Sequence, residues 1–381
     1  MTVHLVSPFA DPAPAPDSPV FRPLRIRNLT LPNRIAMAPM TRELCPNGVP
    51  GPEVAAYYAR RAAGGVGLII TEATDIDHPA SWGGRPGVPR FFGADALAGW
   101  RDIVEAVHDS GGRIAPQLWH IGHERAVSGT LDPGTLLSPS GLSTTGEPAG
   151  KSMDEQDVRD VVDSFARAAT DARRLGFDAV EVSGSHGFLI DQFFWAFTNR
   201  RADDYGGTLE RRTRFGAEVV AAVRAALGPE IPIILRISQW KVADFSARLV
   251  ESPRELERFL APLVEAGVDV FHCSTRRFWL PEFEGSDLNL AGWVKKLSGA
   301  HAMTVGSVGL DGADFWTALT EGAQAENAGL ARLERMLEQE EIDLAAVGRA
   351  LLADPRWLEK LRVGDGADPV TFHRDILPTL H

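Results

Sequence analysis

The stretch that decides the fold reads Ile233-Ile234-Leu235-Arg236-Ile237, then PRELERFLAPLVEA at 253–266, then Gly267, then Val270-Phe271-His272-Cys273. Short, mostly apolar runs are typical of parallel strands that are covered on both faces. The middle segment has the spacing of an amphipathic helix, and a glycine directly after it suits a left-handed helix end. This stretch predicts a strand, a helix and a second strand parallel to the first.

The same alternation occurs eight times. The expected strands are Arg34–Ala38, Gly67–Thr71, Arg113–Leu118, Ala179–Val182, Ile233–Ile237, Val270–Cys273, Met303–Val305 and Leu344–Val347. The expected helices are Glu53–Ala63, Leu97–Ser110, Glu155–Leu175, Leu209–Leu227, Pro253–Ala266, Leu290–Ser298, Asp314–Leu319 with Leu330–Gln339, and Pro355–Arg362. Eight strand–helix units predict an α/β fold, a closed (β/α)8 TIM barrel. A doubly wound open sheet ranks second, because no GxGxxG follows the first strand.

The expected organisation has three parts. Residues 1–20, rich in proline and alanine, form an extended lead-in; residues 21–364 form the barrel, with an insertion at about 120–150; residues 365–381 form a short tail. The insertion is rich in glycine, proline and serine, which suggests a small hairpin or a lid. Ser152 and Glu155 have the spacing of a capping box before the third helix.

Composition narrows the class of protein. The 381 residues are 44% hydrophobic and 24% charged, with a net charge of −12. Nucleic acids and anionic membranes attract basic surfaces, so neither is expected as a partner. The two cysteines build no disulfide framework, and neither a signal peptide nor a bilayer-spanning stretch is evident. We expect a cytoplasmic enzyme that acts on a small molecule, without a metal site; a homo-oligomer is compatible with the sequence.

Two strand ends suggest a phosphate site. Active sites of such barrels lie at the carboxyl ends of the strands, and phosphates bind after strands seven and eight. Gly306-Ser307-Val308-Gly309 follows the seventh expected strand, and Gly348-Arg349 follows the eighth. Glycines allow backbone N–H groups to approach an anion, and arginine adds charged donors. Either pair alone could be turn glycines or a surface ion pair, but together they favour a bound phosphate.

Other strand ends carry polar and aromatic groups. Arg236 lies within an apolar strand, where a buried guanidinium needs an anionic cofactor or a structural carboxylate as partner; the sequence favours neither. Thr41 and Gln117 offer uncharged hydrogen bonds. The loops above the barrel carry an aromatic set that would either pack the rim or hold a flat ligand, namely Trp82, Trp119, Trp240, Phe278 and Trp279.

From about Phe21 to about Gly364, the chain resembles the old yellow enzyme family of FMN-dependent oxidoreductases. The motifs are Leu31-Pro32-Asn33-Arg34, Ala38-Pro39-Met40-Thr41, Ile69-Ile70-Thr71-Glu72-Ala73, Gln117-Leu118-Trp119, Tyr205-Gly206-Gly207 followed by Glu210-Arg211-Arg212-Thr213-Arg214-Phe215, and Val347-Gly348-Arg349 with Asp354-Pro355.

The resemblance implies an FMN site and NAD(P)H as reductant. Pro39, Met40, Thr41 and Ala73 would line the isoalloxazine ring, and Gln117 would bond its pyrimidine part. Arg236 would lie by N1 and C2=O, where a cation stabilises the reduced anionic flavin. The phosphate would be held by Gly306, Ser307, Gly348 and Arg349.

The chain departs from the family where the substrate binds. Members usually carry His-x-x-His or His-x-x-Asn and then Gly-Tyr after strand four. Here Ser183 and His186 take the two polar positions, and Phe188 takes that of the tyrosine. A phenyl ring cannot donate a proton. We expect His186 to be the main group that binds the substrate carbonyl or acts as acid, with Ser183 assisting, because histidine titrates near neutral pH. Protonation of the substrate carbon would then come from water or not be needed.

Trp119, Phe188, Trp240 and Trp279 would shape the substrate pocket. The expected function is transfer of hydride from NAD(P)H through FMN to an activated C=C bond, as in an enone, or to another electrophile. The alternatives are a dehydrogenase or dienoyl-type reductase of the same superfamily and a non-catalytic flavin-binding barrel. A barrel isomerase or aldolase is disfavoured, because no strand end carries a lysine or paired carboxylates. The sequence specifies neither the substrate, nor NADH against NADPH, nor the proton donor that replaces the tyrosine.

Overall fold

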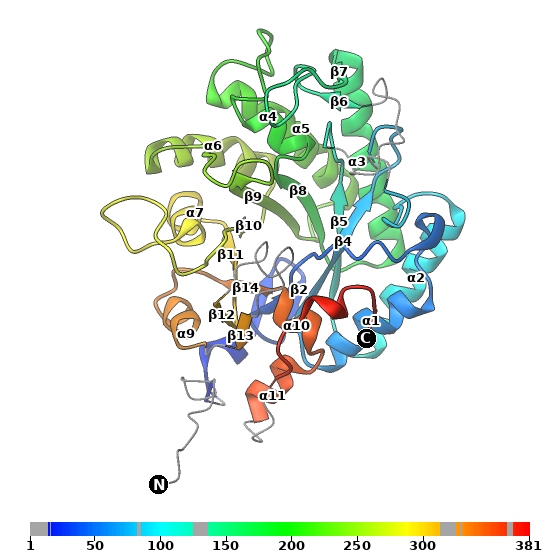
Figure 1. Cartoon of the computed structure of the whole chain (residues 1–381), viewed down its shortest axis with the longest axis vertical. Coiled ribbons are helices and arrows are strands. Elements are labelled where there is room, and N and C mark those ends of the chain that lie inside the picture. Colours follow the sequence, from blue (N-terminus) through cyan, green and yellow to red (C-terminus); the bar gives the residue numbers. More distant parts are fainter. Residues whose placement is uncertain are drawn as a thin grey trace.

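The computed structural model describes residues 14–15, 17–81, 85–124, 136–312, 325–327, 330–363 and 369–381, with the side chains of 311–312 and 325–327 left aside. Eight parallel strands form a closed barrel, as predicted (Figure 1). In barrel order they are β3 (Ile35–Met37), β4 (Leu68–Asp75), β5 (Ile114–Trp119), β8 (Val180–His186), β9 (Ile233–Lys241), β10 (Val270–Ser274), β11 (His301–Val305) and β14 (Leu344–Val347).

Helices surround the barrel between successive strands (Figure 1). They are α1 (Pro52–Ala63), α2 (Ala94–Asp109), α3 (Glu155–Leu175), α5 (Leu209–Leu227), α6 (Pro253–Ala266), α7 (Leu290–Ser298), α9 (Ala331–Glu338) and α11 (Trp357–Val363). Two shorter helices, α4 (Leu189–Phe194) and α10 (Arg349–Ala353), follow β8 and β14 directly. The predicted helix Asp314–Leu319 lies outside the described residues.

The start of α3 corrects one prediction. The N-cap is Asp154, whose carboxylate accepts from the backbone N–H groups of Gln156 and Asp157, and the Asp157 side chain returns the bond to the Asp154 backbone. This reciprocal pair is a capping box shifted two residues from the predicted Ser152–Glu155 pair. Asp154 is the N-cap because a carboxylate is a stronger hydrogen-bond acceptor than a hydroxyl and is stabilised by the positive end of the helix dipole.

The described part of the insertion contains two short paired strands with a turn between them. Strands β6 (Leu137–Ser138) and β7 (Lys151–Ser152) pair in parallel, and Leu142 bridges to Pro148 across the turn between them. Residues 369–381 of the tail return to α1, where Arg60 and Arg61 donate to the carbonyls of Leu380 and His381 (Figure 1).

The barrel interior changes from apolar to polar along its axis. Its lower layers contain Leu68, Ile70, Ile234, Val270, Met303 and Leu344, among others. The hairpin of β1 (Leu24–Ile26) and β2 (Leu29–Leu31) packs its apolar side chains on these layers and so covers the amino-terminal end. The described interior is therefore filled with side chains at the base, as expected for an eight-stranded barrel, and a ligand must bind at the carboxyl end.

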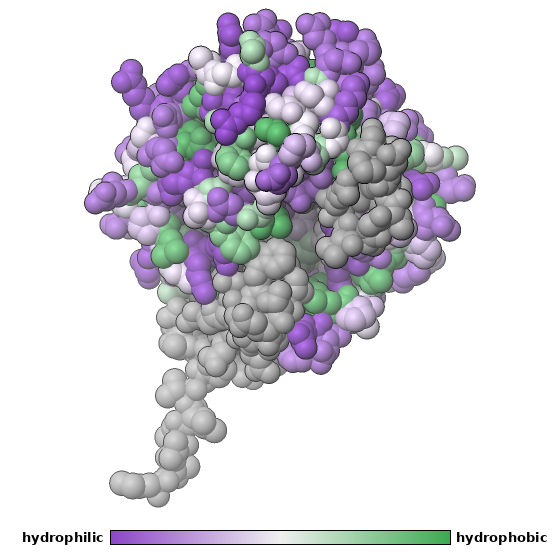
Figure 2. Space-filling model, turned by 45° about the horizontal axis from the view of Figure 1, so that its top comes forward, coloured by the Kyte–Doolittle hydropathy of each residue, from purple (hydrophilic) through white to green (hydrophobic). Residues whose placement is uncertain are grey.

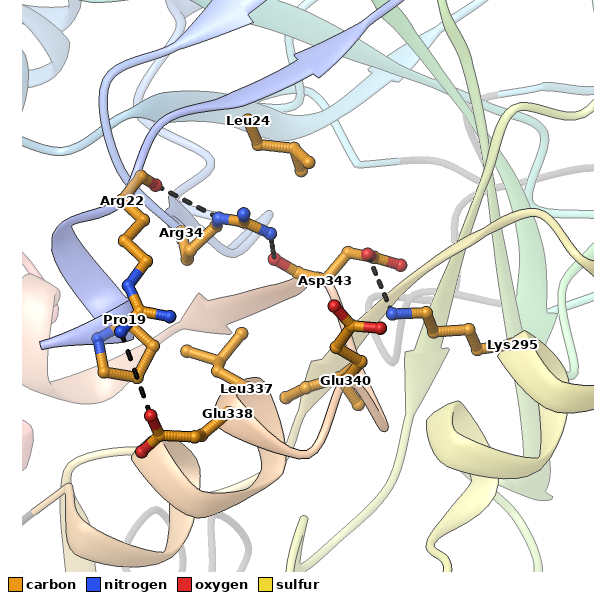
Figure 3. Close-up of a pocket in the computed structure, with 10 residues that line it drawn as sticks. Pro19, Arg22, Leu24, Arg34, Lys295, Leu337, Glu338, Glu340 and Asp343 are labelled. Carbon is orange, nitrogen blue, oxygen red and sulfur yellow. Dashed lines mark hydrogen bonds and ion pairs between the residues drawn. The ribbon is translucent and has the colours of Figure 1, made fainter.

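The base carries a pocket of about 260 Å³, and several of its charged groups have partners within it (Figure 3). Arg34 donates to the carbonyls of Arg22 and Asp343, and Lys295 forms an ion pair with Asp343 at 3.0 Å. Arg22 lies 3.8 Å from Glu338. These contacts join β3, α7, α9 and the segment before β14, so we interpret this pocket as a structural junction.

The outer surface is mostly hydrophilic on the face shown in Figure 2, with apolar residues in small groups. Within the described part of the chain, the helices are too short or too polar to cross a lipid bilayer.

Candidate active site

Four polar side chains from four strands meet above the apolar layers. Glu181 on β8 accepts from the Gln117 amide at 2.7 Å and contacts the His272 ring at 2.6 Å. Arg236 on β9 lies in register with Ser183 on one side and His272 on the other. Residues in register on parallel strands face the same side of the sheet, so this polar layer faces the barrel interior.

Two nitrogen atoms of the polar layer have no hydrogen-bond partner within the described part of the chain. The Arg236 Nε and the His272 Nε2 are buried without a hydrogen-bond partner among the described residues. Burial lowers the pKa of both groups, although the nearby Glu181 carboxylate acts to raise it. Buried polar atoms that lack a partner are costly and rare. Arg236 and Gln117, which the resemblance assigns to the flavin ring, therefore fit a flat polar cofactor that would supply the missing partners.

Two of the residues predicted to line the ring, Ala73 and Met40, have neighbours that are also predicted to bind the cofactor. Ala73 on β4 lies in register with Gln117 on β5. Pro39, Met40 and Thr41 leave the end of β3, and the Met40 sulfur lies 3.6 Å from the point where a Cβ on Gly348 would stand. The missing side chain of Gly348 thus leaves open space beside Met40.

The predicted phosphate residues also meet, although they are far apart in the sequence. Gly306 and Ser307 adopt positive φ values of 142° and 57°. A Cβ on Gly306 would stand 2.4 Å from the carbonyl oxygen of Thr275, so this position requires glycine. The Arg349 guanidinium donates to the Ser307 hydroxyl at 3.2 Å. A tight backbone turn, a hydroxyl and a guanidinium are suited to bind a phosphate group.

His186 stands at the end of β8 in a left-handed conformation with φ 65°. Its backbone N–H donates to the Ser238 hydroxyl at 2.9 Å, and its Nε2 lies 2.8 Å from the Ser274 hydroxyl. The Trp240 ring packs on the imidazole with centroids 4.4 Å apart. Such strain in a non-glycine residue persists only where its surroundings hold it, and it is common at functional sites.

The environment of His186 argues against the expected acid role. Burial lowers its pKa well below the ordinary value, and the positive charges of Arg236 and Lys241 lower it further. At neutral pH the ring is therefore uncharged and offers a hydrogen bond rather than an easily released proton. Ser183 is buried, and its register pairing with Arg236 places it on the interior face.

Three of the four predicted pocket aromatics lie near His186. Phe188 packs edge-on against Trp119 at 5.2 Å and lies 6.4 Å from the His186 ring. Trp240 donates from its indole N–H to the Ser274 carbonyl at 3.2 Å. Trp279 instead contacts Phe278 and Arg277 and packs against the outer core. Its place in the pocket stays a prediction.

A buried ion pair supports the turn after β8. Lys241 and Asp191 are fully buried and lie 2.8 Å apart, and the second oxygen of Asp191 accepts from the Gly187 N–H at 2.6 Å. Because Gly187 follows His186 directly, this pair fixes the backbone that carries the imidazole. Breaking a buried ion pair is costly because it leaves an uncompensated charge. The pair therefore holds the turn in this conformation.

None of the three tyrosines reaches this site. Tyr57 and Tyr58 are buried on α1, where the Tyr58 hydroxyl accepts from the Glu72 backbone N–H. The Tyr205 hydroxyl donates to Glu218. Phe188 therefore has no tyrosine substitute.

The sequence analysis missed Glu181 as the centre of the polar layer. The signal was present, because a carboxylate between Val180 and Val182 is as unusual in an apolar strand as Arg236 is. What the sequence lacks is the strand register, which brings Gln117 and His272 to the two oxygens of Glu181.

Comparisons with known proteins agree with this geometry. Residues 19–311 match the model of the NADH:flavin oxidoreductase / NADH oxidase family. The chain is 35% identical over 269 residues to the "Probable inactive reductase easA" of Epichloe festucae var. lolii, covering 70% of each chain. It is 32% identical over 352 residues to an NADH oxidase of Thermoanaerobacter brockii, covering 89% of this chain and 50% of that one. A solved structure of morphinone reductase with tetrahydroNAD superposes with a TM-score of 0.74 at 30% identity, over 92% of both chains.

Proposed function

The chain belongs to the NADH:flavin oxidoreductase / NADH oxidase family, whose members work with FMN and NAD(P)H, and we propose that it reduces small electrophiles, above all activated C=C bonds such as those of enones. The observation that carries the proposal is the polar layer at the carboxyl end of the barrel. Arg236 and His272 present buried atoms without partners there, and the Gly306–Ser307 turn meets Arg349 nearby.

The residues divide the work between binding and reaction. When bound, FMN supplies a two-electron carrier that can take hydride from NAD(P)H and pass it to an acceptor. Gln117 and Arg236 would orient the ring, and the Arg236 charge would favour its electron-rich state. Ser307 and Arg349 would hold the phosphate through hydrogen bonds. These assignments of single residues are part of the proposal.

His186 and the aromatic residues would receive the substrate. A neutral imidazole can donate one hydrogen bond to a carbonyl oxygen and so draw electrons away from the conjugated C=C bond. Ser183 would add a second donor from the same face. Trp119 and Phe188 would exclude water from the reacting carbons, which strengthens these hydrogen bonds.

Purified protein tests the proposal. We expect a yellow preparation that releases FMN on denaturation, loses its colour with NADH or NADPH under anaerobic conditions, and regains it with 2-cyclohexenone. Arg349→Met should weaken FMN retention, whereas Arg356→Met, on the surface near α11, should not. A folded protein that takes up no FMN would refute the proposal.

Non-catalytic flavin binding is the second candidate function. The observation that favours it is Phe188 in place of a proton-donating residue, and one relative carries the name of a probable inactive reductase. In that case FMN would bind but NAD(P)H would not bleach it, or no acceptor among enones, nitro compounds and quinones would restore the colour.

The proposal includes a cytoplasmic location and no nucleic-acid or membrane partner. The net charge of −12 supports this part of it. Fractionation of cells that express the chain, followed by detection in the soluble and membrane fractions, tests the location.

A further inference from the structure

Asp75 ends β4 at the mouth of the barrel, beside the substrate-facing aromatics. A bulge between Ile70 and Ala73 resets the pairing of β4 with β5, after which Ala73 faces Gln117 and Asp75 faces Trp119. Gln117 points into the barrel, since its amide donates to Glu181. Residues in register share a face, so Asp75 and Trp119 lie one step above the polar layer and point to the same side.

The Asp75 carboxyl lacks the partners that a buried charge requires. Asp75 and Trp119 are each 2% exposed, and the Asp75 Oδ1 and the Trp119 indole nitrogen have no hydrogen-bond partner in the part of the chain that the structure describes. Arg90, whose charge acts on Asp75, extends over the Phe92 ring and forms no ion pair with Asp75. Two neighbouring unsatisfied polar groups need an explanation, and a bound substrate would provide one.

The chemistry of the proposed function requires an acid at this place. Addition of hydride to the β-carbon of an enone leaves an electron pair on the α-carbon, conjugated with the carbonyl. Phe188, which packs on Trp119, has no proton to give, and the His186 ring is held by Ser274. Asp75 is a carboxyl that faces the same side as Trp119 and lies in register with it.

We propose that Asp75 is the proton donor for the α-carbon of the substrate, an inference that rests on the proposed function. The Asp75 O–H bond breaks, its proton forms a C–H bond with the α-carbon electron pair, and the carbonyl is restored. The carboxylate then recovers a proton from water. The hydride comes from NAD(P)H by way of the cofactor, so one hydride and one proton saturate the double bond.

The electrostatics support this role. Burial raises the pKa of Asp75 well above its ordinary value, and the attraction of Arg90 only partly opposes this. A carboxyl that stays protonated at neutral pH is a competent general acid.

The test separates electron transfer from proton transfer in the FMN-loaded enzyme. Asp75→Asn keeps the shape but removes the proton. After anaerobic reduction by NAD(P)H, reoxidation by 2-cyclohexenone should slow at least about a hundredfold, the lower end of what a general acid contributes. Reoxidation by ferricyanide, which takes electrons without protonation of carbon, should change less than about twofold. Asp75→Glu should recover part of the enone rate, and Phe188→Tyr in the Asp75→Asn background should recover more.

A second readout does not depend on activity. The infrared spectrum of the wild type minus that of Asp75→Asn should contain a protonated carboxyl band at neutral pH; a carboxylate band there would overturn the proposal. An unchanged enone rate in Asp75→Asn, or an equal loss with ferricyanide, would also overturn it. If Asp75→Asn fails to fold, Asp75→Ser replaces it in the same assays. Failure of the proposed function itself looks different, because the wild type would then not be bleached by NAD(P)H or not reoxidised by the enone.

Discussion

The two ends of the barrel differ in how completely their buried polar groups are paired. At the base, Asp178, Asp269 and Asp343 each precede a strand. Each accepts a backbone N–H from the first or second residue of the neighbouring strand, namely that of Ile114, Ile233 or Ala302. Each also has basic neighbours, such as Arg224 for Asp269 and Lys295 for Asp343. These carboxylates join adjacent strands and are well paired.

At the mouth, polar atoms are buried without partners. Arg236, His272, Asp75 and Trp119 each have one such atom among the described residues. An unsatisfied group destabilises the folded chain by about 1–3 kcal/mol. The difference teaches that polar burial alone does not identify a site in this barrel. The Arg224 Nε at the base is also buried without a partner among the described residues, so the mouth is marked by the grouping of several such atoms near one layer.

The largest expected effect comes from a matched pair of arginine variants. Arg236→Met should weaken FMN binding by about 10- to 150-fold, because hydrogen bonds from a charged group contribute about 1.5–3 kcal/mol. Arg224→Met at the base should leave FMN affinity unchanged and lower the unfolding temperature, because Asp269 loses a partner at 2.5 Å. Flavin fluorescence titration and thermal unfolding of the flavin-free protein measure the two effects. Equal loss of FMN affinity in both variants would remove the distinction between the ends.

The next effect is on the pH dependence of stability. Burial raises the pKa of Glu72, at the mouth end of β4, to about 8, against the opposing hydrogen bond and charge of Arg42. Since this value lies above that of the unfolded chain, the folded protein holds the extra proton. The contribution of Glu72 is therefore complete below about pH 4 and is lost as the pH rises towards 8, by at most about 1.4 kcal/mol per pH unit.

Glu72→Gln sharpens this point. The amide oxygen can still accept the backbone N–H groups of Arg42 and Glu43, which both bond the same Glu72 oxygen. Between pH 5 and 8, the free energy of unfolding should therefore fall less for the variant than for the wild type, by at most about 1.4 kcal/mol per pH unit. Urea unfolding at several pH values measures this difference. Parallel curves for the two proteins would mean that Glu72 is ionised in the folded state.

The fold and part of the site could be predicted from the sequence. Strand β4 shows both what periodicity predicts and where it fails. Apolar periodicity predicted this strand as Gly67–Thr71, but it continues to Asp75 beyond a bulge that breaks the alternation. Periodicity cannot signal a residue beyond such a break, so Asp75 was missed. Arg236 was found because one charge interrupts an apolar run, whereas its relation to Glu181 depends on strand register.

The phosphate residues were predictable for a different reason. Gly306 and Gly348 follow strands seven and eight, and the fold alone places those strand ends side by side. The contact between Ser307 and Arg349 then follows from topology and needs no knowledge of side-chain packing. Whether Trp279 joins the other aromatic residues depends on loop conformation, which the sequence pattern does not encode.

The smallest expected effect lies at the base and has the opposite pH dependence to Glu72. Burial acts to raise the pKa of Asp343, but hydrogen bonds from His301, the Ala302 backbone and Lys295 hold it below the ordinary value. Asp343→Asn should lower the free energy of unfolding by about 1–2 kcal/mol at pH 7. Because a lowered pKa stabilises the fold only where the unfolded chain is also ionised, the loss should shrink as the pH falls below about 4.

Arg22→Ala, whose guanidinium is exposed and 3.8 Å from Glu338, is the matched control, with an expected change within about 0.5 kcal/mol. A larger loss for Arg22→Ala than for Asp343→Asn would contradict this prediction. It would mean that the surface contact of Arg22 stabilises the base more than the bond between Asp343 and the Ala302 backbone N–H.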